Sequence, residues 1–174
     1  MKKLAIMTLC FLALAACGKK GIDVGGEKSG TGSAATYRYN MPTGDSIVDA
    51  RYGKEAFFAY GAIAGRKETP ANGLAKTHRF ENGQSLHTLQ VNIALPKDGT
   101  FYEGWLEDVK SGEKLSTGHL LSIQGDVRHT LSFESTKDLS AFTKVTITLE
   151  KDDGNSAQGT VVADGTLKEL KRDK

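Results

Sequence analysis

The chain has 174 residues, of which 39% are hydrophobic and 25% charged, a composition typical of a folded domain rather than a disordered segment. The formal net charge of +2 is too small to indicate binding to nucleic acid or to another polyanion. The two cysteines exclude a disulfide framework and a cysteine-rich zinc site, and the length leaves room for one domain.

The first residues have the pattern of an export signal. Met1, Lys2 and Lys3 form a short basic start, and residues 4–16 form an uncharged apolar run. A run of this length matches the apolar region of a signal peptide and is too short to cross a bilayer core, which takes roughly 20 residues. We therefore predict that residues 1–16 are a signal peptide and are removed.

The end of that run resembles the lipobox of bacterial lipoproteins. Leu14, Ala15 and Ala16 precede Cys17, and Gly18 follows it. The resemblance implies cleavage before Cys17, attachment of diacylglycerol to its thiol and acylation of the new amine by a fatty acid such as palmitate. Two or three acyl chains anchor a protein stably, whereas one does so only marginally. The alternative is a secretory signal without lipid, in which Cys17 is incidental.

These features predict a protein anchored to the cell membrane or the outer membrane, with its domain on the extracytoplasmic side. Loss of Lys2 and Lys3 leaves equal numbers of basic and acidic side chains, and Cys10 leaves with the signal. A lipid on Cys17 then leaves no thiol for catalysis, redox chemistry or metal binding. Residues 17–36 contain the lipidated cysteine and a linker rich in Gly, Ser and Lys, which we predict to be a flexible tether reaching about 25 Å.

From residue 37 the sequence predicts short antiparallel strands. Apolar and polar residues alternate over 89–95, 127–133 and 145–150, the pattern of strands with one buried and one polar face. Residues 101–107 also fit a strand, and 55–63 and 160–163 are weaker candidates. An amphipathic helix over 57–63 is the alternative for the first of these, and residues 138–142 read as a single turn. Dipeptides that favour tight turns separate the runs: Asn82-Gly83, Asp98-Gly99, Ser111-Gly112, Asp153-Gly154 and Asp164-Gly165.

This spacing of strands and turns predicts an all-β fold, a single antiparallel β-sandwich over residues 37–168 followed by a polar tail over 169–174. Three segments also resemble a known family. They are Phe101–Leu106, Leu115–Leu120 and Val145–Glu150, with Gly154-Asn155 and Val161–Gly165 behind them. Their order resembles the extracytoplasmic C-terminal domain of anti-sigma-K (RskA-like) factors, and the resemblance covers residues 85–168. It implies an immunoglobulin-like sandwich. The family's cytoplasmic sigma-binding domain and transmembrane helix have no counterpart in this sequence.

Candidate chemistry is sparse. The four histidines are His78, His87, His119 and His129, and none of their spacings is that of a metal motif. His129 is in phase with Val127 and Leu131, which favours a core histidine bonded to the backbone. His119 and His129 are nevertheless the best pair for copper or zinc, if folding brings them together.

Catalytic motifs are weaker still. The sequence has no Gly-x-Ser-x-Gly nucleophile motif. Glu103 and Glu107 would lie roughly 13 Å apart on a strand, too far for a glycosidase pair, and favour a solvated polar face. Residues 152–155 resemble a calcium loop only superficially and favour a turn.

We therefore expect a non-enzymatic binding or sensing module of the cell envelope, whose only cofactor is the lipid on Cys17. Its partner would be a protein or another envelope component, recognised through strand edges or through the loops at Asn82-Gly83, Ser111-Gly112 and Asp153-Gly154. The alternative is a periplasmic metal-binding or redox accessory protein that uses His119 and His129.

Overall fold

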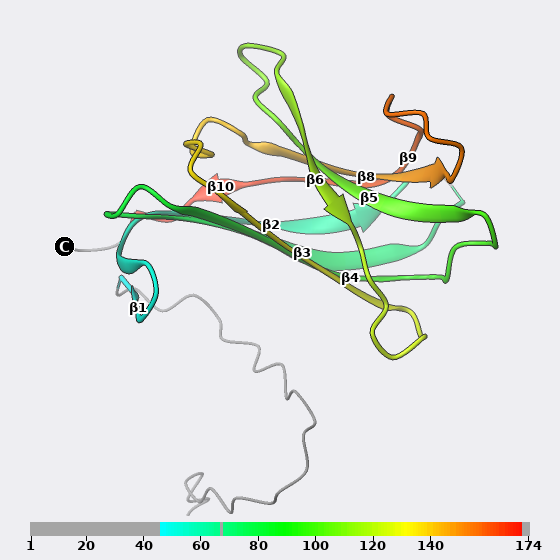
Figure 1. The fold of residues 1–174 in the computed structure, drawn as a ribbon, viewed down its shortest axis with the longest axis horizontal. Helices are drawn as coiled ribbons and strands as arrows, with labels where there is room; N and C mark the ends of the chain where they lie inside the picture. The colour runs from blue at the N-terminus through cyan, green and yellow to red at the C-terminus, as the bar shows by residue number, and fades with distance from the viewer. Residues whose placement is uncertain (1–45, 67, 172–174) are drawn as a thin grey trace, which may run out of the picture. The chain divides into compact units, whose positions relative to one another are not determined.

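The computed structural model describes residues 46–66 and 68–171, and all regular structure within them is β-strand (Figure 1). The prediction of an all-β fold is confirmed. The signal peptide, Cys17 and the tether lie outside the described residues. The strands are β1 (Val48–Asp49), β2 (Gly53–Gly65), β3 (Ala71–Phe80), β4 (Ser85–Ile93), β5 (Thr100–Glu107), β6 (Lys114–His119), β7 (Arg128–Ser135), β8 (Lys144–Lys151), β9 (Thr160–Thr166) and β10 (Lys168–Glu169).

The strands form one continuous antiparallel sheet that nearly closes on itself. Its order is β6-β5-β8-β9-β2-β3-β4-β7, and the short strands β1 and β10 both pair with β2. The two outer strands of this order meet at one point, where Leu121 and Thr130 exchange backbone hydrogen bonds of 2.8 and 2.9 Å. The result is a barrel-like ring that a single pair closes among the described residues.

This arrangement differs from the expected sandwich. A sandwich has two separate sheets, whereas here each main strand is hydrogen-bonded to the next in one path. The immunoglobulin-like arrangement is therefore not confirmed. The physical reason is that alternation of apolar and polar residues specifies a strand and its buried face but not the strand's neighbours.

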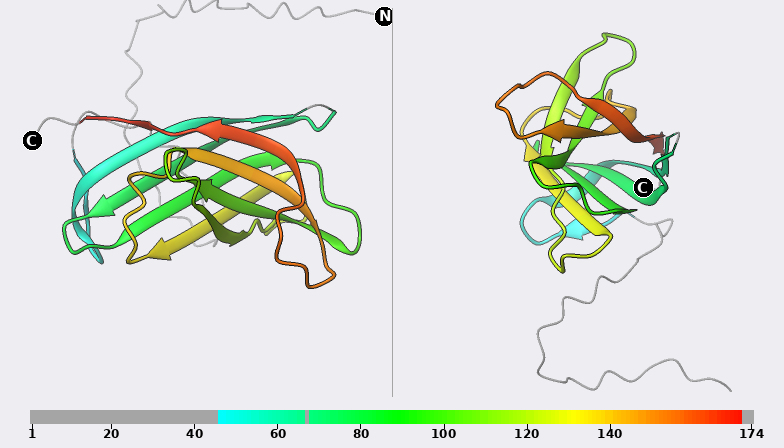
Figure 2. Two further views of the ribbon diagram at one scale, coloured as in Figure 1. Left: turned by 90° about the horizontal axis from the view of Figure 1, so that it is seen from above. Right: turned by 90° about the vertical axis from the view of Figure 1, so that its right-hand side faces the viewer.

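The strand directions give the sheet two distinct ends (Figure 2). Because every neighbouring pair is antiparallel and each main strand reverses the one before it, the connections alternate between the ends. At one end the described chain begins at Ser46 and finishes at Lys171, and we call this the proximal end. It also holds the connections 81–84, 108–113 and 136–143. The distal end holds the β2–β3 connection and the connections 94–99, 120–127 and 152–159.

The core fills the inside of the ring. Leu89, Leu106 and Ile147 come from three different strands and have no exposed surface. The predicted burial of alternate residues in β4 is confirmed, because Leu89, Val91 and Ile93 are all buried. In β7 the prediction holds for Leu131, whereas the preceding Val127 lies before the strand and is 51% exposed.

The outer face of β8 is polar, as the alternation predicts, but it is not exposed as in a half-buried strand. Thr146, Thr148 and Glu150 are all buried. The connection 152–159 folds back over them, and the Gly159 N–H donates to Glu150 Oε1 at 2.9 Å. The indole N–H of Trp105 donates to Thr148 Oγ1 at 2.9 Å, so these polar atoms are satisfied by protein rather than by water.

Two further predictions concern the helical alternative for β2 and the positions of the tight turns. Residues 55–63 are strand, so the helical alternative is wrong. The tight turns at Gly83, Gly99, Gly112 and Gly154 are confirmed by φ values between 75° and 85°. The turn predicted at Asp164-Gly165 is wrong, because both residues lie inside β9.

Gly165 serves close packing rather than a turn. A Cβ atom at this position would lie 2.3 Å from the backbone oxygen of Ala62, on the neighbouring β2. A glycine in a strand interior often marks such a close approach of another backbone.

Candidate functional site

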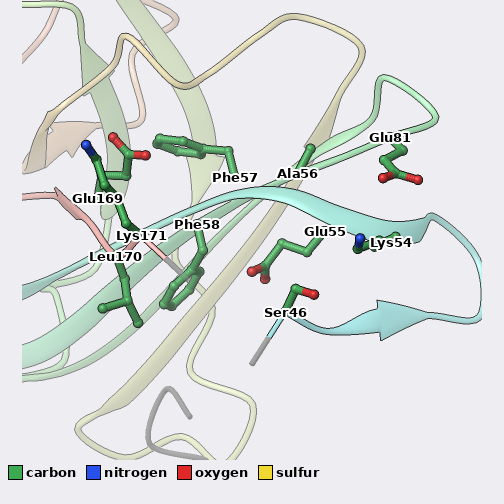
Figure 3. A pocket seen from close by; sticks show the side chains of 10 residues that line it. All are labelled: Ser46, Lys54, Glu55, Ala56, Phe57, Phe58, Glu81, Glu169, Leu170 and Lys171. Atoms are coloured by element: carbon green, nitrogen blue, oxygen red, sulfur yellow. The ribbon is translucent and has the colours of Figure 1, made fainter. Parts of the chain in front are cut away.

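A pocket of about 530 Å³ lies at the proximal end, beside the first half of β2 (Figure 3). It occupies the stretch of β2 between its pairing with β1, at Gly53 and Lys54, and its pairing with β10, at Ala59 and Tyr60. Aromatic and aliphatic side chains line it together with charges of both signs. The lining residues are Ser46, Lys54, Glu55, Ala56, Phe57, Phe58, Glu81, Glu169, Leu170 and Lys171.

The pocket wall contains a buried carboxylate–imidazole pair. Glu55 Oε2 lies 2.7 Å from His78 Nδ1, and their side chains are 2% and 13% exposed. Sequence reasoning missed this pair, because Glu55 and His78 are 23 residues apart and no local pattern connects them. A buried carboxyl group needs such a hydrogen-bond partner, because polar atoms removed from water are otherwise left unsatisfied.

An aromatic row runs beside this pair across β2 and β3. Ring centroids are 5.0 Å apart for Tyr52 and Phe80, 6.0 Å for Phe80 and His78, and 4.6 Å for His78 and Phe58. The row continues from Phe58 to Tyr60 at 5.7 Å. The His78 ring is thus packed between two phenyl rings, an environment that fixes the imidazole in place and contributes to the stability of the β2–β3 pair.

A second candidate surface lies at the distal end. Leu121, Ile123 and Val127 are 62%, 73% and 51% exposed in the β6–β7 connection, and Leu95 is 52% exposed in the β4–β5 connection. The two connections are adjacent, because the Ile93 N–H donates to the Val127 carbonyl at 2.9 Å. We call these four residues the distal patch. A tight loop presents Ile123, since the Ser122 hydroxyl bridges to the backbone of Asp126.

The distal patch carries little unpaired charge. Arg128, which flanks it, contacts the Asp126 carboxylate and the Gln124 side chain. The Arg128 guanidinium holds the pKa of Asp126 below its usual range. The sequence signal for this patch is the apolar Ile123 within a Ser-Ile-Gln-Gly-Asp turn, where polar residues are expected.

The three loops predicted as contact surfaces do not share one end. Asn82-Gly83 and Ser111-Gly112 lie in proximal connections, whereas Asp153-Gly154 lies in a distal one. The prediction that residues 152–155 form a turn is confirmed, because the Asn155 N–H donates to Asp153 Oδ1 at 3.0 Å.

The histidine pair considered for metal binding is not brought together. His129 is buried and packs edge-on against Tyr102, with ring centroids 5.4 Å apart. His119 is exposed and stacks on Phe101 at 4.0 Å. Because Phe101 and Tyr102 are successive residues of β5, they face opposite sides of the sheet, and so do the two histidines. The expectation of a core His129 bonded to backbone is confirmed, since its Nδ1–H donates to the Val127 carbonyl at 3.0 Å.

His87 is the most deeply buried titratable group of the interior. It has no exposed surface, and its Nδ1 lies 2.8 Å from Thr77 Oγ1 on the neighbouring strand. Burial lowers the pKa of His87 to about 4, because the charged imidazolium is poorly solvated inside the ring. The imidazole is therefore neutral at physiological pH.

The two carboxylates of β5 are engaged separately. Glu103 accepts a hydrogen bond from the Ser116 hydroxyl, and Glu107 Oε2 lies 2.7 Å from Lys144 Nζ. The Lys144 ammonium lowers the pKa of Glu107. Both side chains are half-buried rather than fully solvated, and each is held by a neighbouring strand.

No three His, Cys, Asp or Glu side chains within residues 46–66 and 68–171 are grouped so that they could hold a metal ion. The same residues contain no helix long and apolar enough to span a bilayer. Comparison of the chain with protein-family models, with curated proteins and with solved structures found no match. The lipobox and the resemblance to anti-sigma-K domains therefore stay predictions.

Proposed function

We propose that the protein is a lipid-anchored, extracytoplasmic binding module of the cell envelope, with the lipid on Cys17. The lipobox pattern around Cys17 supports the anchor. The absence of a paired nucleophile and base motif in the sequence supports binding rather than catalysis. An immunoglobulin-like sandwich and a relationship to anti-sigma-K domains are not needed for this proposal.

The observation that carries the binding role is the position of the distal patch. The described chain begins and finishes at the proximal end, whereas Leu95, Leu121, Ile123 and Val127 expose apolar surface at the other. Exposed apolar side chains that gather in one place favour an interaction site, whereas singly scattered ones do not. We infer that the distal patch contacts a partner protein.

Crosslinking in intact cells tests the binding role. A photo-crosslinking amino acid at Ile123 samples the distal patch, and the matched control is Val109, which is 60% exposed at the proximal tip of the β5–β6 hairpin. We expect a discrete crosslinked product from position 123 that is absent from position 109. Equal products at the two positions, or none at either, would contradict the proposed role.

Metabolic labelling with a clickable palmitate tests the anchor separately. The wild-type chain is expected to be labelled and to sediment with membranes, and Cys17→Ser is expected to abolish both. The proposed anchor is wrong if the wild-type chain stays unlabelled while the variant stays membrane-bound.

A further inference from the structure

The ring of strands has one incomplete seam, between β6 and β7. Leu121 and Thr130 form its only backbone pair among the described residues. Figure 1 shows β6 and β7 diverging from the loop that joins them. At the proximal mouth of the seam, Lys137 Nζ lies 2.5 Å from Glu113 Oε1. We call the unpaired edge formed by residues 131–135 of β7, with residues 114–118 of β6 opposite it, the slot.

The β7 side of the slot presents unpaired backbone groups. The N–H and C=O of Thr130 point toward β6, because both bond to Leu121. Backbone groups alternate sides along a strand, so those of Ser132 and Glu134 point the same way, into the slot. On its other side β7 is paired with β4 along the whole strand, from Arg128 to Ser135. In the described part of the chain no strand pairs with Ser132 and Glu134 from the slot side.

Side chains of β6 and β7 fill the interior behind the slot. Leu115 and Phe133, one on each strand, are partly buried against the core. Thr117 is 5% exposed, and its hydroxyl has no hydrogen-bond partner among the described residues. That hydroxyl lies in the interior near Leu131, because both approach the point where a Cβ atom on Gly104 would stand, at 2.7 and 3.1 Å. A buried hydroxyl without a partner is costly, so this part of the interior carries a local energetic penalty.

We propose that the slot receives an extended segment of a partner polypeptide, which adds as a strand to the open edge of β7. Along such an edge, every second residue offers one N–H and one C=O. Another extended backbone complements this pattern, whereas a lipid or a sugar does not. The exposed Lys137–Glu113 pair across the mouth is a weak barrier, since its side chains are 44% and 48% exposed. This inference depends neither on the lipid anchor nor on the distal patch.

The slot also defines which segments fit. Side chains of the added strand that face inward lie beside Leu115 and Phe133, which are only partly buried, and this favours small apolar residues. Side chains that face outward lie beside the exposed Ser132 and Glu134, which favours polar residues, and the Glu134 carboxylate already faces Arg51 at 3.6 Å. The expected ligand is thus a segment in which apolar and polar residues alternate. Its expected length is about three to five residues, because residues 114–118 and 131–135 border the slot.

Hydrogen exchange on the purified full chain tests whether the edge is open. The amides of Ser132 and Glu134 are expected to exchange on the order of 100-fold faster than those of Leu131 and Phe133, which face β4. Equal protection of the two sets would show that the seam is closed in solution and would overturn the proposal.

Crosslinking tests the occupant. A photo-crosslinking amino acid at Glu134 is compared in intact cells with one at Thr88, which lies on the outer face of the adjacent β4. We expect a product with a second polypeptide from position 134 only. Ser132→Pro removes an N–H that points into the slot and not toward β4, so it should leave the fold intact and reduce the product at least tenfold.

The melting temperature of each variant shows whether it folds. If Ser132→Pro does not fold, the second test is Glu134→Pro with the crosslinker placed at Ser132. Ser132→Thr keeps the N–H and should leave the product unchanged. No product, a product insensitive to both proline variants, or a product with the mass of two copies of this chain would each overturn the proposal.

Discussion

Acid should destabilise the fold through His87. The imidazole is completely buried between strands β3 and β4 and hydrogen-bonds to Thr77. Burial lowers its pKa in the folded chain to about 4, against an ordinary value of 6.5. Unfolding exposes the ring to water, so the unfolded chain binds a proton at a pH where the folded chain does not.

The sign and the pH window follow from this difference. Above pH 6.5 the imidazole is neutral in both states, and His87 adds no pH dependence to the free energy of unfolding. As the pH falls from 6.5 toward 4, the unfolded chain takes up the proton and the free energy of unfolding falls. A difference of about 2.5 pKa units corresponds to a loss of about 3 kcal/mol, at about 1.4 kcal/mol per unit. This is a large part of the stability of a typical domain.

Urea unfolding of the Cys17→Ser chain at a series of pH values between 7.5 and 4 measures the effect. The double variant His87→Leu with Thr77→Val removes the imidazole without leaving the threonine hydroxyl unpaired. Between pH 6.5 and 4, we expect the free energy of unfolding of the double variant to fall by about 3 kcal/mol less than that of the parent. His119→Gln, at an exposed histidine, serves as the control and should leave the curve unchanged. A double variant that loses stability in acid as steeply as the parent would refute the reasoning.

Three further predictions concern stability and can be checked by urea unfolding at neutral pH. Thr148→Val leaves the buried Trp105 indole N–H without its acceptor and should cost about 1–3 kcal/mol, whereas Thr148→Ser keeps the hydroxyl and should cost less; equal costs would contradict the hydrogen-bond argument. Gly165→Ala forces a Cβ atom against the Ala62 carbonyl and should cost about 1–3 kcal/mol, so an unchanged stability would show that β2 and β9 can separate without penalty. Arg66→Ala breaks a two-bond ion pair with a carboxylate, but the Arg66 side chain is 47% exposed, so no measurable loss of stability is expected, and a clear loss would mean that the pair is shielded from solvent.

The sequence predicted strands well where one face alternates cleanly. Residues 89–93 of β4 and 101–107 of β5 were recognisable because apolar residues recur at every second position or aromatic residues cluster. Strand β3 was missed, because the run Thr77-His78-Arg79 has no apolar alternation. Its inward Thr77 is satisfied by His87 and its outward His78 by Glu55, partners from other strands that no local pattern reveals.

The candidate sites were less predictable for the same reason. The pocket depends on β10 and β1 pairing with separate parts of β2. The stretch of β2 between them, which is unpaired on that side, can be recognised only once the strand pairing is known. The slot depends on one pair, Leu121 and Thr130, being the only closure of the ring in the described residues. Residue periodicity fixes which face of a strand is buried, whereas these sites arise from which edges remain unpaired.

The distal patch and the slot are distinct surfaces, and they need not bind the same partner. Ile123 lies at the apex of the seam, where the backbones of β6 and β7 meet, whereas the slot widens toward Glu113 and Lys137 at the proximal end. The eight residues of β7 span about 26 Å, so a side chain seated on Ile123 is remote from the proximal mouth. Substitutions this far apart act independently unless one rigid partner covers both. A single protein recovered from both positions would therefore have to be large enough to span the length of the sheet, whereas two different proteins would indicate a module that connects them.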